Sequence, residues 1–143
     1  MKIRLLMLGK TKRAECRALI EDYAARIRHF APFEIIETRE DSAAAAGKVK
    51  TGAAAEWVLL DAAGKQLTTP QFAKWLGDLR DRGTRELIFL CGTDHGFPEE
   101  LRQRPQHRIS LSTLTMPHEF ARVVLAEQIY RAFTILHGHP YSK

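Results

Sequence analysis

Short apolar segments in this chain alternate with longer segments whose apolar residues recur at helical spacing. The apolar, strand-like segments are 3–8, 33–38, 57–61, 87–91 and 108–112. Segments with helical periodicity lie between most of them and after the last one. Strands that alternate with helices favour a parallel sheet covered by helices. We therefore predict an α/β fold with a parallel-dominated sheet and helices on both faces, in a single domain spanning 1–143.

Start and stop signals sharpen the predicted helices. The first covers 14–29 and the last covers 120–136, and Pro98 opens a short polar helix. Thr68, two residues before a proline, is typical of an N-cap, and Gly83 is a typical stop for the helix between them.

Two segments are less regular. Segment 41–56 is rich in alanine but contains two glycines, which cost about 1 kcal/mol each in a helix, so a short imperfect helix or a mobile connection is predicted. Residues 61–65 are predicted to form a turn, with Asp61 at the end of the preceding strand.

The net charge of +5 is concentrated near the N-terminus. Residues 1–31 hold eight Lys or Arg and three Asp or Glu, which leaves +5, the whole net charge of the chain. Such a cluster indicates a polyanionic partner, and Lys10, Lys12 and Arg13 are candidate RNA contacts in a basic loop. Charge alone leaves open the alternative that these residues form an ordinary solvated surface.

Composition points to a reducing compartment. No segment approaches the roughly 20 apolar residues of a membrane span, and the apolar run 5–8 is too short for a signal peptide. Cys16 and Cys91 belong to no C-x-x-C pair, so a zinc or redox motif is not expected. We predict a cytoplasmic protein that has no membrane partner.

Three predicted strands end in loops suited to ligand binding. These are 60–64, 92–96 and 112–117, which contain glycines and small hydroxyl residues. Parallel strands place such loops at the same sheet edge, where α/β proteins bind their ligands. No loop matches a classical dinucleotide or phosphate-binding motif, and each alone is more often an ordinary turn than a binding loop.

The last helix and the tail hold further candidates. Helix 120–136 is apolar over most of its circumference, which fits either burial against a second subunit or a central core position in a monomer. His139 and Tyr141 in the tail can transfer protons, and tyrosine can stack on a base. The pair His137 and His139 lacks a nearby third ligand, so no metal is predicted.

Several motifs carry a resemblance to a known family. They are MKIRLLMLGK at 1–10, LLDxxGK at 59–65, SLSTLTMPH at 110–118, and RVVLAEQIYRAF at 122–133 followed by HPY at 139–141. With them the chain resembles the SPOUT-class methyltransferases over nearly its whole length, in particular the small bacterial enzymes that methylate N3 of a pseudouridine in 23S rRNA.

The resemblance implies a fold, a cofactor and partners. The C-terminal segment would form a trefoil knot, a known exception to unknotted chains. The protein would be a homodimer that uses S-adenosylmethionine as methyl donor and acts on the ribosome. By motif, the cofactor contacts fall on Leu60, Gly92, Leu111, Ser112, Thr113, Leu114, Thr115 and Met116.

The resemblance also implies residues for catalysis and RNA binding. The tail would reach the partner subunit's active site, where His139 and Tyr141 are catalytic candidates. Arg122 or Lys143 would help to hold RNA phosphate. The pseudouridine N3 must lose a proton before it attacks the methyl group, and a base or a positive field in the tail would favour that loss.

Three departures from the family pattern motivate other interpretations. Thr93 stands where a second glycine is usual, Ser142 stands where the tail usually has a histidine, and the segment between the second and third strands is shorter and poorer in lysine. One alternative is therefore a catalytically impaired member that keeps an RNA-binding or ribosome-associated role. Another is an α/β enzyme for an unrelated small molecule, which the N-terminal basic cluster argues against.

Overall fold

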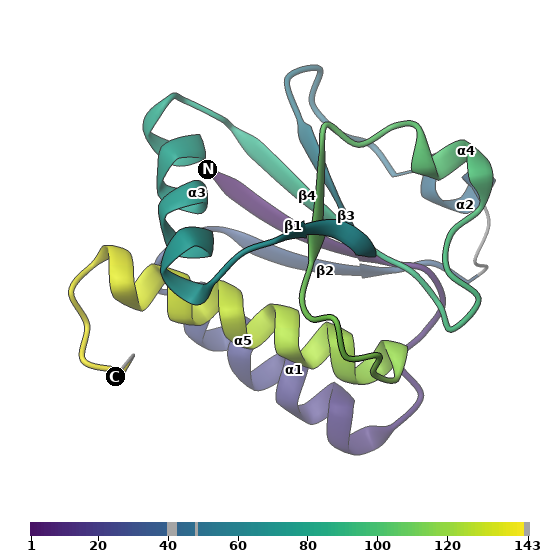
Figure 1. The fold of residues 1–143 in the computed structure, drawn as a ribbon, viewed down its shortest axis with the longest axis horizontal. Helices are drawn as coiled ribbons and strands as arrows, with labels where there is room; N and C mark the ends of the chain where they lie inside the picture. Colours follow the sequence, from purple (N-terminus) through teal and green to yellow (C-terminus); the bar gives the residue numbers. More distant parts are fainter. Residues whose placement is uncertain (40–42, 48, 142–143) are drawn as a thin grey trace.

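A computed structural model describes residues 1–39, 43–47 and 49–141. Its sheet has five strands in the order β2-β1-β4-β3-β5, and every pairing between them is parallel (Figure 1). The strands are β1 Lys2–Met7, β2 Phe33–Glu37, β3 Glu56–Gln66, β4 Glu86–Cys91 and β5 His107–Ser110. The predicted parallel sheet is confirmed, with most strand boundaries within one or two residues of those expected.

Helices cover both faces of the sheet, as predicted. They are α1 Ala14–Ile27, α2 Ala43–Gly47, α3 Thr69–Asp81, α4 Glu99–Arg102 and α5 His118–Leu136. The long helices α1, α3 and α5 share one face, where α5 packs between the other two. The short helices α2 and α4 contribute to the cover of the opposite face.

The central strands are apolar because both of their faces are buried. In β4, Leu87 and Phe89 join the core under α1, α3 and α5, while Ile88 and Leu90 join the smaller core on the other face. All four side chains are at most 1% exposed. This double burial explains why the strand is a continuous apolar run rather than an alternating one.

The predicted helix signals around α3 are confirmed. Thr68 is its N-cap, and its hydroxyl accepts from the Gln71 backbone while the Gln71 side chain accepts from the Thr68 backbone. At the other end Gly83 has a φ of +93°, a conformation that glycine adopts at little cost after a helix. Local signals therefore fix this helix at both ends.

The predicted end of β3 at residue 61 is wrong. The strand runs to Gln66, and its pairing with β5 shifts register between Leu60 and Lys65, so 61–64 bulge out within the strand. Asp61 accepts a hydrogen bond from the Ala63 backbone, which gives the bulge its turn-like character. Gly64 lets the chain pair with β5 again from Lys65, because a Cβ at residue 64 would lie only 2.8 Å from the backbone of Arg108 and Ile109.

Smaller differences concern the ends of other elements. β5 ends at Ser110 rather than at residue 112, and α5 begins at His118 rather than at 120. Of segment 41–56, α2 supplies a short helix as expected, while residues 41, 42 and 48 lie outside the described residues. In the described ranges, no helix is both long enough and apolar enough for a membrane span. The trefoil knot and the single-domain boundaries stay predictions.

Candidate functional site

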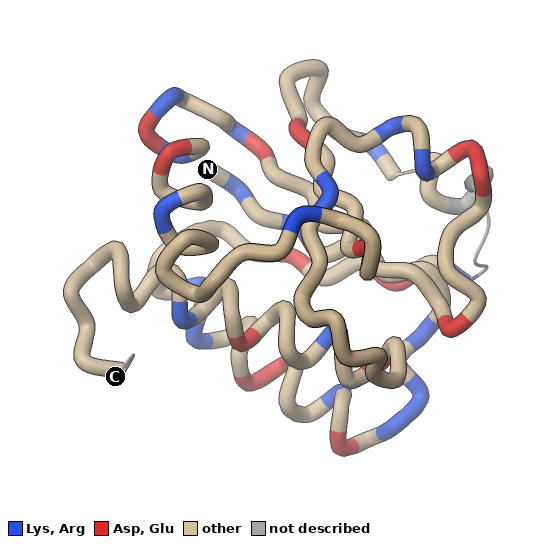
Figure 2. The backbone as a smooth tube through the Cα atoms, viewed as in Figure 1, with Lys and Arg blue, Asp and Glu red and all other residues tan. Residues whose placement is uncertain are grey.

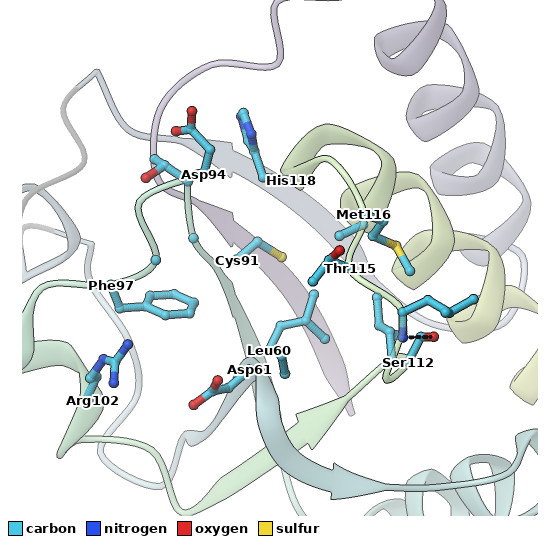
Figure 3. A pocket seen from close by; sticks show the side chains of 17 residues that line it. Leu60, Asp61, Cys91, Asp94, Phe97, Arg102, Ser112, Thr115, Met116 and His118 are labelled. Atoms are coloured by element: carbon cyan, nitrogen blue, oxygen red, sulfur yellow. Dashed lines mark hydrogen bonds between the residues drawn. The ribbon is translucent and has the colours of Figure 1, made fainter.

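A pocket of about 280 Å³ opens at the carboxyl edge of the sheet, where β3, β4 and β5 end or bulge (Figure 3). The predicted convergence of the three loops is therefore confirmed. Of the candidate cofactor residues, all except Thr113 line the pocket. The lining residues are Leu60, Asp61, Ala62, Cys91, Gly92, Thr93, Asp94, Gly96, Phe97, Arg102, Leu111, Ser112, Leu114, Thr115, Met116, His118 and Ala121.

The loop after β4 is a tight turn that leaves no room for a side chain at Gly92. A Cβ built on Gly92 would lie 2.7 Å from the Gly96 carbonyl oxygen and 3.1 Å from the Phe97 ring. Thr93 and Gly96 bond each other's backbone, with N···O distances of 3.3 and 3.0 Å. Gly96 has a φ of +82°, which favours glycine. The two glycines thus set the shape of one pocket wall.

Thr93, the departure from the usual glycine, has neighbours for both of its γ atoms. Its Oγ1 accepts a hydrogen bond of 3.2 Å from the His95 backbone. Its Cγ2 would lie 3.9 Å from a Cβ built on Gly9, so the methyl group is directed toward the end of β1. Thr93 still belongs to the pocket lining, but its hydroxyl is already hydrogen-bonded within the loop.

The loop 111–116 offers backbone groups to a ligand. Its own hydrogen bonds are few: Ser110 Oγ donates to the Ser112 carbonyl, and the Leu114 backbone donates to Ser112 Oγ. Among the described residues, no acceptor bonds the backbone N–H groups of Thr113, Thr115 or Met116. Thr115 and Met116 line the pocket, and free backbone donors at such positions are suited to reading the edge of a heterocycle.

Polar and charged side chains also line the pocket, and few of them are marked in the sequence. In Figure 3, Asp94 and His118 lie on one side, and Arg102 approaches from α4. From the sequence, Asp61 is predicted only as a carboxylate at the end of a strand, and His118 only as the last residue of the motif at 110–118. Arg102 carried no signal, because it reaches the pocket from a short helix whose position depends on the whole fold.

The basic loop, residues 10–13, lies between β1 and α1 next to the start of α5 (Figures 1 and 2). Lys10, Lys12 and Arg13 are exposed, as RNA contacts must be. Glu119 from α5 accepts from the backbone of Lys12 and Arg13, at 3.1 and 2.9 Å. The cations of this loop are therefore displayed on a backbone that α5 holds.

Arg122, a predicted RNA contact, does not reach the surface. Its side chain is 0% exposed and donates to the Leu8 carbonyl at 2.7 Å and to Thr11 Oγ1 at 2.9 Å. A guanidinium buried in this way cannot contact RNA phosphate, so that prediction is corrected. Arg122 instead ties α5 to the end of β1 and to the basic loop. Lys143, the other predicted phosphate contact, and Ser142 lie outside the described residues.

The catalytic candidates of the tail lie at the other end of α5 from the pocket (Figure 1). The 19 residues of α5 span about 28 Å at 1.5 Å per residue. His118 at its first turn lines the pocket, whereas His139 and Tyr141 follow its last turn. One chain therefore does not bring the tail candidates and the cofactor candidates together.

Tyr141 is held against α5, while His139 is exposed. The Tyr141 hydroxyl donates to Glu127 at 3.2 Å, and its ring packs on Tyr130 at 4.7 Å between centroids. Burial, followed by contacts with Tyr23 and Glu127, raises the pKa of Tyr141 to about 12. Tyr141 is therefore protonated at neutral pH, and it acts as a hydrogen-bond donor rather than as a base.

Cys91 at the base of the pocket is not a nucleophile. Burial raises the pKa of its thiol to about 12, against a small opposing effect of Arg122, so the thiolate is scarce at neutral pH. The described part of the chain contains no group of three or more His, Cys, Asp or Glu residues placed to bind a metal ion.

Comparisons with known proteins give this architecture a context. A family model described as "Predicted SPOUT methyltransferase" matches residues 1–142. Proteins named ribosomal RNA large subunit methyltransferase H are similar over 99% of this chain: 42% identical in Geobacter metallireducens, with 98% of that protein covered, and 39% identical in Koribacter versatilis, with 97% covered.

A solved structure shares the fold at low sequence identity. It is a probable methylase family protein from Haemophilus influenzae, with a TM-score of 0.58 and 10% identity, covering 98% of this chain and 68% of that one. At such identity the likeness concerns the fold alone.

Proposed function

Because this chain belongs to the SPOUT methyltransferase family, we propose that it transfers a methyl group from S-adenosylmethionine to N3 of a pseudouridine in 23S rRNA. Relatives about 40% identical over nearly the whole chain, named large-subunit ribosomal RNA methyltransferases, support this substrate. The observation that carries the proposal is the pocket built by three loops at the carboxyl edge of a parallel sheet. An rRNA substrate also implies a cytoplasmic location.

The pocket fits the proposed cofactor in its chemistry. Leu60, Leu111 and Met116 supply an apolar lining for the adenine ring, and the free backbone N–H groups of loop 111–116 supply donors for its edge. Gly92 lines the pocket without a side chain, in a turn where the Gly96 carbonyl and the Phe97 ring fill the space that a Cβ would take. When bound, S-adenosylmethionine supplies a methyl group that is already activated on a sulfonium.

The remaining work of the protein is to hold the base and to remove a proton. The pocket residues align the reacting atoms, which is worth much of the barrier in group transfer. His139 is our candidate general base for the N3 proton, because its ring is exposed and its Nδ1 accepts only a 3.3 Å bond from the Tyr141 backbone. Tyr141, which stays protonated at neutral pH, orients the tail and donates a hydrogen bond.

The active site is proposed to be shared between two copies in a homodimer. The separation of pocket and tail along α5 supports this proposal, because a catalytic tail would have to act in another copy's pocket. Exposed apolar side chains support such an association: Leu114 is 78% exposed, Leu19 46% and Phe120 43%. Only Phe120 of these three lies on α5, and core packing accounts for the other apolar side chains that this central helix buries.

Mass spectrometry of 23S rRNA from cells with and without this protein tests the proposal. We expect one methylated pseudouridine that disappears with the gene and returns with a plasmid copy. Unchanged rRNA in both strains would contradict the proposed reaction. Calorimetry with S-adenosylmethionine addresses the impaired-enzyme alternative, since a protein blocked by Thr93 would bind no cofactor.

A further inference from the structure

Glu119 is a buried carboxylate that the proposed reaction does not use. It is 6% exposed and lies on the first turn of α5, directly after the pocket residue His118. Burial alone would raise its pKa, yet the N–H groups of Arg13 and Lys12, together with the nearby His118 and Arg122, outweigh that effect and hold the pKa of Glu119 below its usual value. The carboxylate is therefore charged at neutral pH, which needs a structural or functional reason.

The contacts of Glu119 are directed at the backbone of the basic loop. Its Oε1 accepts from the Arg13 N–H at 2.9 Å and its Oε2 from the Lys12 N–H at 3.1 Å. Arg13 is the N-cap residue of α1, and its own side chain makes no capping bond. Glu119 thus binds, from a different helix, the N-cap N–H that the N3 side chain of a capping box would bind.

Other residues of α5 contact the same loop or the end of β1 just before it. Arg122, one turn after Glu119, bonds Leu8 and Thr11, and the Phe120 ring lies 5.4 Å from the Arg13 guanidinium. Gly9, which directly precedes the basic loop, is close to the pocket: a Cβ built on it would lie 3.9 Å from Cγ2 of Thr93, a residue of the pocket lining. The backbone of the loop is therefore fixed beside the pocket, while its Lys and Arg side chains remain exposed.

The negative charge of Glu119 is by itself unfavourable for binding RNA at this surface. A negative charge next to Lys10, Lys12 and Arg13 weakens the attraction of that surface for phosphate. Glu119 therefore raises the affinity for RNA only if ordering the basic loop strengthens binding more than the added negative charge weakens it. The two effects predict opposite results when the charge is removed.

We propose that Glu119 is a positioning residue for the RNA substrate, which holds the basic loop beside the pocket so that its phosphate contacts are formed in advance. This inference rests on the proposed function, because it takes RNA as the partner. A loop already in its bound conformation loses less entropy on binding than a free one. The first turn of α5 then joins the cofactor loop and the RNA-binding loop in one rigid unit.

Two charge-matched variants test this role. Glu119→Gln keeps the shape of the side chain but turns one acceptor into a donor that faces a backbone N–H. Glu15→Gln removes the same charge from the first turn of α1, where Glu15 is exposed and makes no hydrogen bond or ion pair within the described residues. The readouts are KM and kcat for methylation of ribosomes from cells lacking this protein, and the Kd for S-adenosylmethionine.

For Glu119→Gln we expect KM for ribosomes to rise about fivefold, as the loss of pre-ordering implies, with kcat and the cofactor Kd unchanged. For Glu15→Gln we expect KM to stay or fall. Equal or lower KM in Glu119→Gln would contradict the proposal, and so would a joint loss of cofactor and ribosome binding, which marks a general folding role. Wild-type protein that methylates no ribosome would instead contradict the proposed function.

Discussion

The two ends of α5 differ in how completely one chain builds their surroundings. At the N-terminal end, Glu119 and Arg122 are buried and bonded to the basic loop, and His118 completes a pocket formed by three strand ends. At the C-terminal end, the tail leaves the helix and lies largely exposed, attached through Tyr141. One chain therefore forms the pocket proposed for the cofactor, whereas the tail proposed for catalysis would have to act at the pocket of a second copy.

The largest expected effect is on the exposed end. Removing the imidazole with His139→Ala should lower kcat about 1000-fold, a typical loss for a general base, because the N3 proton then has no acceptor. The cofactor Kd should stay the same, since the pocket lies at the other end of α5. Single-turnover methyl transfer and calorimetry measure the two quantities, and an unchanged kcat would remove His139 from the mechanism.

The second effect is on the pocket end. A valine at Gly92 would collide with the Gly96 carbonyl, only 2.7 Å from a built Cβ. We expect Gly92→Val to weaken S-adenosylmethionine binding about 100-fold, the order of a severe overpacking cost. Calorimetry measures the change. Gly83→Ala, at a glycine with open space around it but far from the pocket, serves as a control for general backbone strain.

The third effect tests the buried network that makes the N-terminal end rigid. Arg122→Met would leave the Leu8 carbonyl and Thr11 hydroxyl without their donor, at a cost of about 2 kcal/mol in the free energy of unfolding. Urea denaturation measures this change. A stability equal to that of wild type, combined with weaker RNA binding, would restore Arg122 to the surface role predicted from the sequence.

The smallest effect concerns the attachment of the tail. The pKa of Tyr141 is about 12 in the folded chain against 10.0 for an ordinary tyrosine. The protonated phenol therefore contributes its full share of stability below about pH 10, and that share is lost as the pH rises through 12. Difference absorbance of tyrosinate should show this late titration, and it should be missing in Tyr141→Phe. If the tyrosinate signal that Tyr141→Phe removes instead titrated near pH 10, Tyr141 would not be held in its partly buried place against α5.

The sequence predicted the fold and the place of the pocket because both follow from local patterns. Parallel strands bring their carboxyl ends together, so the loops at Gly92 and Ser112 had to meet once the alternation of elements was recognised. The sequence does not predict the continuation of β3, because the close approach that needs a glycine at residue 64 is to β5, a strand more than 40 residues later. That contact leaves no trace in the local sequence.

Side-chain roles were harder to predict than positions. Arg122 carries a charge that usually indicates the surface, and only the packing of α5 over the end of β1 shows that it is buried. Glu119 and Arg102 acquire their places in the same way, from helices that the tertiary structure brings to the pocket. Burial and long-range partners, rather than residue type, decide these roles.

Subunit mixing tests the shared active site most directly. Chains carrying His139→Ala and chains carrying Gly92→Val are unfolded together in equal amounts, refolded, and assayed for methylation of ribosomes. If the tail of one copy completes the pocket of the other, mixed dimers contain one intact site, and roughly a quarter of the wild-type activity should return. Activity no higher than the sum of the two separate variants would contradict a site shared between copies.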